Sequence, residues 1–240
     1  MMEFQAEGLA KWYGKHLAVD GVTLGLNRGE IVGLLGVNGA GKTTTFYMML
    51  GLTRPNAGRV FLDGKEINAL PLHRRAELGI GYLAQEPSIF RHLSVEGNLV
   101  AVLEALPLSR QERKARLEKL LEDLAITHLR RLPAVVLSGG ERRRVEVARA
   151  LASQPSFILL DEPFTGVDPI SVAELQEIIT HLRSREIGIL LTDHNVRETL
   201  EITDRSYIIH QGKILTFGSS AELVNDPLAR QFYLGARFRM

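Results

Sequence analysis

One glycine-rich stretch has the spacing of a phosphate-binding loop, G-x-x-x-x-G-K-[ST], with Gly36, Gly41, Lys42 and Thr43 at the fixed positions. Glycine permits a tight turn in which successive backbone N–H groups point at phosphate oxygens. Lysine supplies a mobile positive charge for the β- and γ-phosphates, and the threonine hydroxyl can bind Mg²⁺. The alternative is a glycine-rich turn with a surface lysine. The residues predicted to hold phosphate are Gly36, Asn38, Gly39, Ala40, Gly41, Lys42, Thr43 and Thr44.

Two carboxylates, Asp161 and Glu162, follow the apolar run 157–160, which predicts a buried strand. Strand-end carboxylates of an open parallel sheet lie at its ligand-binding edge. Because side chains alternate along a strand, the two need not share a task. Asp161 can approach Mg²⁺ through water, and Glu162 can polarise an attacking water as a general base. The alternative, a charge pair at the sheet edge, is disfavoured by the phosphate-binding loop upstream.

Two further polar residues end predicted strands, Gln85 after 79–84 and His194 after 187–192. The amide of Gln85 can orient water or a metal ion, but the residue could equally be a solvated loop residue. The imidazole of His194 could donate to a γ-phosphate and sense its loss. A lone histidine in a loop is more often structural, so position alone makes His194 a candidate.

A second possible anion site begins at Ser138, Gly139 and Gly140, where a hydroxyl and free N–H groups precede a predicted helix. An ordinary helix cap before a basic helix explains the same residues equally well. Near the N-terminal end, Trp12 and Tyr13 are expected in a loop before the first sheet. An aromatic there could stack on a purine, although packing on the rim of the sheet is the favoured interpretation when the residues are taken alone.

The elements around these residues alternate between strands and helices. Val22, Leu24 and Leu26 alternate with smaller residues in a predicted β-rich region, 4–35, and the helix after the phosphate-binding loop includes 46–50. The dipeptides at 63–64 and 211–212 predict the tight turns of two hairpins. Residues 94–132 lack strand patterns and carry leucines at helical spacing, which predicts a separate helical insert. The tail from 221 is predicted to be helical.

Composition limits the function. The chain has 240 residues, 45% hydrophobic and 24% charged, and a net charge of +1. That balance is typical of a globular protein, and it does not indicate binding to nucleic acid or to an anionic membrane. With no cysteine, disulfides and thiolate chemistry are excluded. Residues 1–4 do not resemble a signal peptide, and no run of 18 apolar residues occurs, so contact with a membrane is expected only through partners.

The order of these motifs resembles that of the ATP-binding cassette (ABC) ATPases along essentially the whole chain. Glu141 stands where that family usually has Gln, a variant that leaves Ser138 and Gly140 in place. The resemblance implies an α/β fold: a phosphate-loop NTPase core sheet, an N-terminal antiparallel β-subdomain and an inserted α-helical subdomain. The expected division of this single domain, 1–240, is a core with the β-subdomain at 1–93 and 141–220, a helical subdomain at 94–140 and a C-terminal helical tail at 221–240.

The resemblance also implies a head-to-tail homodimer with two ATP molecules between the subunits. The phosphate-binding loop of one subunit would face Ser138, Gly139 and Gly140 of the other across each ATP. Tyr13 would stack on adenine, and Asp168 would communicate across the dimer. Thr43, Gln85 and Asp161 would hold Mg²⁺. Glu162 would act as the base and His194 as the switch.

Further stretches, including 43–47, 79–83, 161–164, 166–172, 192–200 and 233–235, are similar to the ATPases of lipopolysaccharide-export transporters. This resemblance implies two copies beneath a pair of permease subunits, on the cytoplasmic face of the inner membrane. A groove near Ser88, Ile89, Phe90 and Arg91 would receive a coupling helix. The sequence departs from that pattern at Val37 and at 236–237, and the second departure puts a role of the tail in doubt.

Three other functions compete with this prediction. An ATPase of a branched-chain amino-acid importer shares the cassette and a short tail, but 192–200 and 88–91 favour export. An ABC ATPase of DNA repair or translation usually carries coiled coils or two fused cassettes, which this sequence lacks. A regulatory nucleotide-binding protein without catalysis is disfavoured by the presence of Glu162 and His194.

Overall fold

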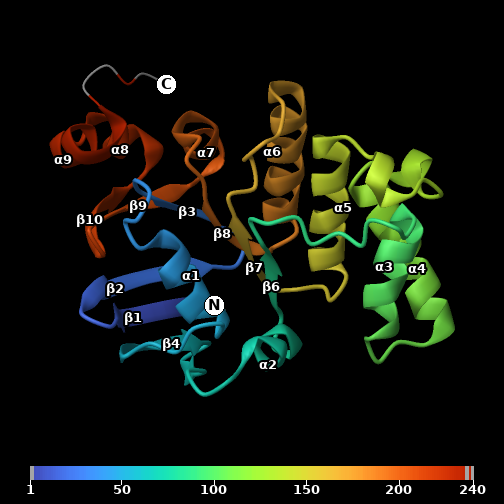
Figure 1. The fold of residues 1–240 in the computed structure, drawn as a ribbon, viewed down its shortest axis with the longest axis horizontal. Coiled ribbons are helices and arrows are strands. Elements are labelled where there is room, and N and C mark those ends of the chain that lie inside the picture. The colour runs from blue at the N-terminus through green and yellow to red at the C-terminus, as the bar shows by residue number, and fades with distance from the viewer. Residues whose placement is uncertain (1–2, 236–237, 239–240) are drawn as a thin grey trace.

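The computed structural model describes residues 3–235 and 238, and the departure at 236–237 lies outside them. A six-stranded sheet with the order β10-β9-β3-β8-β7-β6 forms its centre (Figure 1). All neighbouring strands in it are parallel except β10, which pairs antiparallel with β9. The strands are β3 (Ile31–Leu35), β6 (Ile80–Leu83), β7 (Phe157–Asp161), β8 (Gly188–Thr192), β9 (Arg205–His210) and β10 (Lys213–Gly218).

Strands β7 and β8 are buried on both faces, as their unbroken apolar sequences require. On β7, Ile158 and Leu160 face a cluster of helices, whereas Phe157 and Leu159 face the opposite cluster around the N-terminal sheet. A parallel sheet of this kind places the carboxyl ends of β3, β7 and β8 at one edge. The polar residues that follow these strands therefore meet there.

The N-terminal sheet is antiparallel, with the order β2-β1-β4-β5. Its strands are β1 (Glu3–Tyr13), β2 (His16–Asn27), β4 (Ala57–Leu62) and β5 (Lys65–Glu66). The expectation that Trp12 and Tyr13 lie in a loop is wrong: they end β1 and pair with Leu17 and His16. Gly14, at φ 61°, allows a tight turn, so both strands continue to it.

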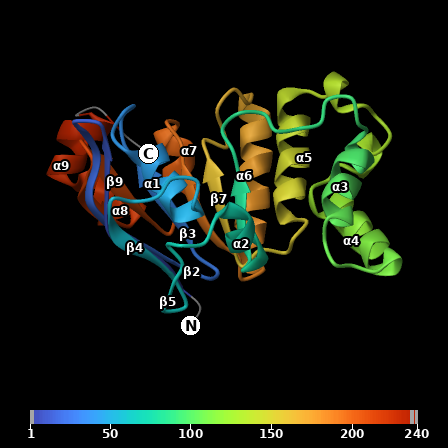
Figure 2. The same ribbon diagram turned by 60° about the horizontal axis from the view of Figure 1, so that its bottom comes forward.

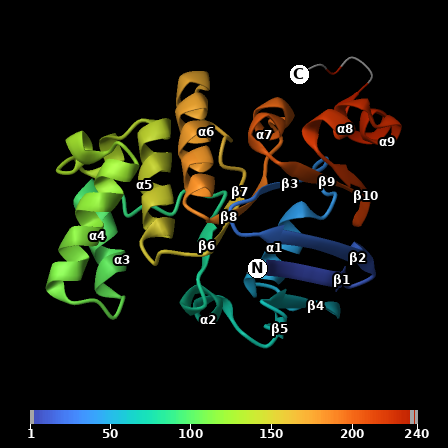
Figure 3. The ribbon, with the colours of Figure 1, turned by 180° about the vertical axis from the view of Figure 1, so that it is seen from behind.

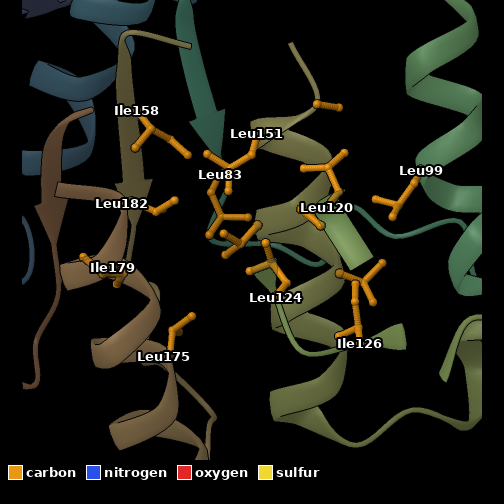
Figure 4. Packing of buried hydrophobic residues seen from close by; sticks show 14 of the residues in the cluster. Leu83, Leu99, Leu120, Leu124, Ile126, Leu151, Ile158, Leu175, Ile179 and Leu182 are labelled. Atoms are coloured by element: carbon orange, nitrogen blue, oxygen red, sulfur yellow. The ribbon is translucent and has the colours of Figure 1, made fainter. Parts of the chain in front are cut away.

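Helices cover both faces of the central sheet, and those on one side extend into a helical region (Figures 1 and 2). The connections of this region include two 3₁₀ turns, η1 (Thr127–Leu129) and η2 (Ala134–Val136). Figure 4 shows how Leu99, Leu120, Leu124 and Leu151 join the residues of β6, β7 and α6 in one apolar cluster. The helices are α2 (Leu72–Glu77), α3 (Val95–Glu104), α4 (Arg110–Asp123), α5 (Gly139–Leu151), α6 (Pro169–Ser184) and α7 (Val196–Ile202).

The C-terminal segment packs beside α7 and β10, as the view from behind shows (Figure 3). It forms α8 (Ser220–Asn225), α9 (Pro227–Ala229) and a π-helical turn, η3 (Arg230–Leu234), which agrees with the helical prediction for the described part of the tail. Across residues 3–235 and 238, no helix combines the length and the apolar character that crossing a membrane requires.

Helix α1 (Lys42–Leu50) follows the phosphate-binding loop, and its C-terminal end is fixed by a buried guanidinium. Arg75 of α2 is only 1% exposed and donates to carbonyl oxygens of Met48 (3.0 Å), Met49 and Ile67 (3.0 Å). Burial lowers the pKa of Arg75 to about 10, so the group stays charged at neutral pH. One charged side chain thus satisfies carbonyls that the end of a helix leaves without donors.

We expect Arg75→Met to lower the free energy of unfolding by about 3 kcal/mol, since it leaves several buried carbonyls without a donor. Urea denaturation would measure the loss. The matched control is Arg74→Met: Arg74 is exposed and, among the described residues, its side chain pairs only with Glu77, so its loss should cost about 0.5 kcal/mol or less. Equal effects of the two substitutions would contradict the structural role of Arg75.

Candidate functional site

A cleft of about 730 Å³ opens at the edge where β3, β7 and β8 end. Its walls come from the phosphate-binding loop, the start of α1, the β1–β2 hairpin and the residues after β6, β7 and β8. Sequence segments more than a hundred residues apart therefore meet in one hollow. The lining residues are Tyr13, His16, Ala18, Asn38, Gly39, Gly41, Lys42, Thr43, Thr44, Gln85, Glu162, Thr165 and His194.

The phosphate-binding loop depends on glycine at two close approaches. Gly41 has φ 107°, and a Cβ there would lie 2.7 Å from the carbonyl oxygen of Ala18. A Cβ at Gly36 would lie 2.3 Å from the carbonyl oxygen of Ile209. Because real Cβ atoms do not approach backbone oxygen so closely, both positions exclude other residues unless the backbone moves.

Lys42 is buried at the base of the cleft, and its Nζ donates to the carbonyl oxygens of Gly36 (2.6 Å) and Val37 (3.1 Å). Burial lowers the pKa of the Lys42 ammonium, while the nearby carboxylates of Glu162 and Asp161 oppose that shift. The ammonium is therefore held inside the loop by neutral acceptors that a phosphate oxygen could replace.

Glu162 adopts an uncommon backbone conformation immediately after β7, with φ 46°. A non-glycine residue in this region carries strain of roughly 1–3 kcal/mol, of the kind often found at functional sites. The turn directs its side chain into the cleft, while its backbone N–H donates to the carbonyl oxygen of Thr192 at 2.7 Å.

One oxygen of the Glu162 carboxylate, Oε2, meets three polar groups. Gln85 Nε2 donates to it at 2.8 Å and Thr165 Oγ1 at 3.1 Å, and His194 Nδ1 lies at 3.3 Å. No described residue donates to Oε1. The carboxylate is thus fixed in orientation through one oxygen, and the other oxygen can accept a proton.

Thr165 was not predicted from the sequence as a site residue. Its hydroxyl lies between Glu162 Oε2 and His194 Nδ1, at 3.1 and 3.3 Å. A threonine two residues after a proline carries no motif of its own, so only the folded turn identifies it. The structure brings together the predicted candidates Gln85, Glu162 and His194 and adds Thr165 to them.

Asp161 lies behind the cleft and is 1% exposed. Neither carboxylate oxygen has a hydrogen-bond partner among the described residues, and the same holds for the hydroxyl oxygen of the neighbouring Thr192. Burial, with a further contribution from Glu162, raises the pKa of Asp161 to about 6. A buried carboxylate with two free oxygens fits a metal-bound water, because Mg²⁺ is usually held by one or two carboxylates, waters and substrate phosphates.

Asp193, between Thr192 and His194, serves the loop rather than the cleft. Its two oxygens accept from the backbone N–H groups of Phe164 (2.8 Å) and Asn195 (2.9 Å). Burial raises the pKa of this carboxyl group, and these two donors oppose the shift. The carboxylate thereby fixes the turn that carries Thr165 to the loop that carries His194.

Arg143 of α5 was predicted only as part of a basic helix, yet it is 7% exposed. Its guanidinium donates to the carbonyl oxygens of Ala84 (2.9 Å), Asp161 (3.1 Å) and Pro163 (3.2 Å) and pairs with Glu146 at 3.1 Å. It therefore connects the ends of β6 and β7 to α5. Helical periodicity did not single it out, because its neighbours in sequence are also arginines.

Ser138, Gly139, Gly140 and Asp168 do not line the cleft. Ser138 caps α5. Its Oγ accepts from the N–H of Glu141 at 3.2 Å, and the Glu141 carboxylate accepts from the N–H of Ser138 at 2.8 Å. Asp168 caps α6 by accepting from Ser171 N–H at 3.1 Å. A Cβ at Gly140 would lie 2.3 Å from Ser171 Oγ, so these two helix ends are in close contact.

Tyr13 lies at the rim of the cleft and is 50% exposed. Lys11 Nζ lies 5.5 Å from the centroid of its ring, so an adenine could stack only on a part of the ring that Lys11 does not cover. Trp12, 42% exposed, is not among the lining residues.

Comparison with known proteins supplies independent findings. The sequence profile of the ABC transporter family matches residues 19–165. The lipopolysaccharide export system ATP-binding protein LptB of Acidithiobacillus ferridurans is 58% identical over 98% of each chain. LptB of Escherichia coli K12 is 54% identical over 100% of each chain. A solved ATP-binding cassette of an ABC transporter in its ADP conformation has a TM-score of 0.88 at 28% identity and covers 98% of this chain and 99% of that one.

We expect Asp161→Asn to raise the free energy of unfolding of the ligand-free protein by roughly 1–3 kcal/mol at about pH 7.5. The folded-state pKa, about 6, is above the unfolded value, 3.8, so the ionised carboxylate destabilises the fold at high pH. That penalty, and with it the gain from Asn, should shrink as the pH falls from about 6 towards 4. Urea denaturation at about pH 7.5 and pH 5 measures both.

Asp168→Asn is the matched control. Hydrogen bonds from Ser171 lower the pKa of Asp168, so its charged form is already favoured and removing the charge should bring no gain. If Asp161→Asn raised the free energy of unfolding equally at both pH values, the destabilisation could not be assigned to the ionised carboxylate of Asp161.

Proposed function

This chain belongs to the ABC transporter family, and on that premise we propose that it is the ATP-hydrolysing subunit of a transporter that exports lipopolysaccharide. The assignment of lipopolysaccharide as the transported substrate rests on the sequence identity of 54–58% to LptB proteins over 98–100% of both chains. The assignment of ATP hydrolysis is supported by the position of the Glu162 carboxylate, which is held beside a phosphate-binding loop.

ATP would bind with its phosphates in the loop and its adenine on the Tyr13 ring. The β- and γ-phosphates would replace the carbonyls of Gly36 and Val37 as partners of Lys42. The backbone N–H groups of residues 39 and 41–44 would donate to phosphate oxygens, with the N-terminal end of α1 behind them. The hydroxyls of Thr43 and Thr44 face the same cleft.

Glu162 would accept a proton from the water that attacks the γ-phosphate, through the carboxylate oxygen that no described residue occupies. Gln85, Thr165 and His194 would hold the other oxygen, Oε2, and so fix the orientation of the carboxylate toward the attacking water. His194 Nδ1 is within reach of both Thr165 and Glu162. This arrangement makes its remaining ring nitrogen, Nε2, available to a γ-phosphate.

Residues that fit Mg²⁺ are Thr43 and Gln85, which line the cleft, and Asp161, whose oxygens have no partner. When bound, the ion would neutralise charge on the β- and γ-phosphates. Within the described residues no cluster of three or more His, Cys, Asp and Glu side chains forms a metal site by itself. A site completed by substrate phosphates agrees with that observation.

The active form would be a head-to-tail homodimer. Ser138, Gly139 and Gly140 lie outside the cleft of their own subunit, so they can reach an ATP only in another copy. The Ser138 hydroxyl accepts from the N–H of Glu141, and its proton would turn from the Glu141 carboxylate to a phosphate oxygen of that ATP. Asp168 lies at the neighbouring helix end, where Gly140 meets Ser171, and would carry the contact between copies.

The permease partner would bind at the stretch Ser88, Ile89, Phe90 and Arg91. Ile89 and Arg91 line a hollow of about 140 Å³, and Phe90 is 47% exposed. Arg149 of α5 donates to the carbonyl of Ser88 at 2.5 Å and lies 4.5 Å from the Phe90 ring. A displacement of this stretch would therefore be transmitted to α5, whose N-terminal end is capped by Ser138.

Two such subunits would lie on the cytoplasmic face of the inner membrane and contact it through the permeases alone. We assign the core with its β-subdomain to 1–93 and 141–220, the helical subdomain to 94–140 and the tail to 221–240. The identity to LptB proteins does not favour the alternative, a branched-chain amino-acid importer with the same cassette chemistry.

We expect Glu162→Gln to lower the ATPase turnover number by roughly a hundredfold or more, since the amide cannot act as a base. ATP binding should persist because Lys42 and the loop are unchanged, and ATP should trap a dimer visible by size-exclusion chromatography. Turnover and nucleotide affinity would be measured on the same preparation.

Glu77→Gln is the control, since Glu77 is exposed and its carboxylate pairs with Arg74 alone in the part of the chain that the structure describes. It should hydrolyse ATP at the wild-type rate. Wild-type turnover by Glu162→Gln would refute its role as the base, and a monomer that binds ATP without dimerising would refute the shared site.

We expect a detergent pull-down with this subunit as bait to recover two permeases and a periplasmic bridge component. Phe90→Asp should abolish the capture, because it places a charge at the proposed docking stretch. Phe217→Asp is the matched control: Phe217 is also an exposed aromatic, 64% exposed, but lies on β10. Capture of amino-acid permeases instead would overturn the transported substrate and leave the ATPase mechanism in place.

A further inference from the structure

A second cavity, of about 190 Å³, lies at the edge of the central sheet opposite the nucleotide cleft. Ser156 and Ile187 in its wall directly precede β7 and β8, whereas Glu162 and His194 follow those strands. Five residues at about 3.3 Å each separate the two edges by roughly 16 Å. The cavity is therefore a separate site, and the proposed function makes no use of it.

Four positive side chains from three elements converge on this cavity. Arg28 comes from the turn before β3, Arg116 and Lys119 from α4, and Arg185 from the end of α6. The one carboxylate in the wall is Asp123. The C-terminal ends of α4, α5 and α6 also approach the cavity, but their partial negative charges of about half a unit each offset only part of the four cations.

Two of the guanidinium groups are fixed by contacts that leave some of their N–H groups free. Arg116 donates to the carbonyl oxygen of Ala152 at 3.1 Å and to Gln154 Oε1 at 2.9 Å. Arg185 pairs with Asp123. An arginine has five N–H donors, so each side chain keeps donors while its position is set by the fold. Fixed guanidinium groups bind anions with a smaller loss of side-chain entropy.

Lys119 differs from the arginines because it has no hydrogen bond or ion pair with any residue that the structure describes. A purely structural explanation, in which basic side chains tie α4 to the loops before β7 and β8, accounts for Arg116 and Arg185. Lys119 is exposed and lines the cavity, and that explanation gives it no contact. The surplus charge is what an anionic ligand would neutralise.

The remaining wall is apolar and limits the size of the ligand. Leu120, Leu151, Pro155 and Ile187 line it. A volume of about 190 Å³ holds roughly six water molecules at about 30 Å³ each. That is below the range of about 300–1,000 Å³ for drug-sized pockets, which excludes a nucleotide or a lipid as an enclosed ligand.

We propose that this cavity, bounded by Arg28, Arg116, Lys119 and Arg185, is a binding site for a small organic phosphate monoester. The tetrahedral dianion is matched by cations from different directions, and a short carbon body is matched by the four apolar residues. The ligand joins α4 of the helical region to the amino edge of the sheet. It therefore acts on the same α4–α5 packing that supports Ser138 at the other end of α5.

The test is a calorimetric titration of the full chain with glycerol 3-phosphate, in the presence of saturating ADP and Mg²⁺ so that the nucleotide cleft is filled. We expect saturable binding by the wild type and no signal with glycerol. Lys119→Gln should weaken the affinity about tenfold, and Lys119→Glu should abolish binding. Arg28→Gln, on a different element, should weaken it by a similar factor.

Lys114→Gln is the matched control, because Lys114 lies on the same helix and is exposed but does not line this cavity. Its affinity should equal that of the wild type. Absence of binding by the wild type overturns the proposal, as does equal affinity of the wild type and Lys119→Glu. Equal affinity for inorganic phosphate and glycerol 3-phosphate overturns the proposal that the ligand carries an organic group. None of these outcomes bears on ATP hydrolysis, so the two proposals fail separately.

Discussion

The buried guanidinium of Arg143 is the interaction on which the rest of the site depends. It donates to carbonyl oxygens after β6 and β7, and burial lowers its pKa while Glu146 opposes the shift. Removing such a group would leave several carbonyls unsatisfied inside the protein, which is costly. Its hydrogen bonds fix the backbone that carries Gln85 and Glu162 relative to α5. The geometry of the proposed catalytic residues and the attachment of α5 therefore depend on one side chain.

The same contact shows how a signal could pass through the molecule. The segment after β6 begins at Gln85 in the cleft and reaches Phe90 at the proposed docking surface. Two residues of α5, Glu146 and Arg149, bind Ser88 of that segment through its N–H (2.9 Å) and its carbonyl (2.5 Å). The proposed base Glu162, the proposed docking surface and α5 are thus linked by a chain of hydrogen bonds. Such a chain can transmit a displacement because none of its members can move alone.

Sequence reasoning found the parts of this site that local chemistry specifies. The phosphate-binding loop and the polar residues after apolar strands were predictable, because a glycine spacing and a strand end each have one dominant structural context. Arg143 and Thr165 were not predictable, since their roles come from contacts across 18 residues or more and from a turn in an uncommon conformation. Trp12 and Tyr13 were assigned to a loop, because the glycine turn that extends β1 and β2 was not recognised. The proposed partner of Ser138, an ATP bound to another copy, lies outside one chain, so no single-chain argument can locate it.

The capping box of α5 has one more consequence. Glu141 stays ionised, because the N–H of Ser138 and its hydroxyl lower the pKa of that carboxyl group. Its charge lies within the first turn, where the helix would otherwise present about half a unit of positive charge. This end of α5 therefore offers an incoming anion hydrogen-bond donors with little net attraction. Dissolved phosphate and chloride gain little there, whereas a terminal phosphate presented at the correct distance by another protein gains the full set of bonds. Because Glu141 cancels the positive charge of the helix end, binding of an anion there depends on the geometry of its hydrogen bonds and not on its charge alone.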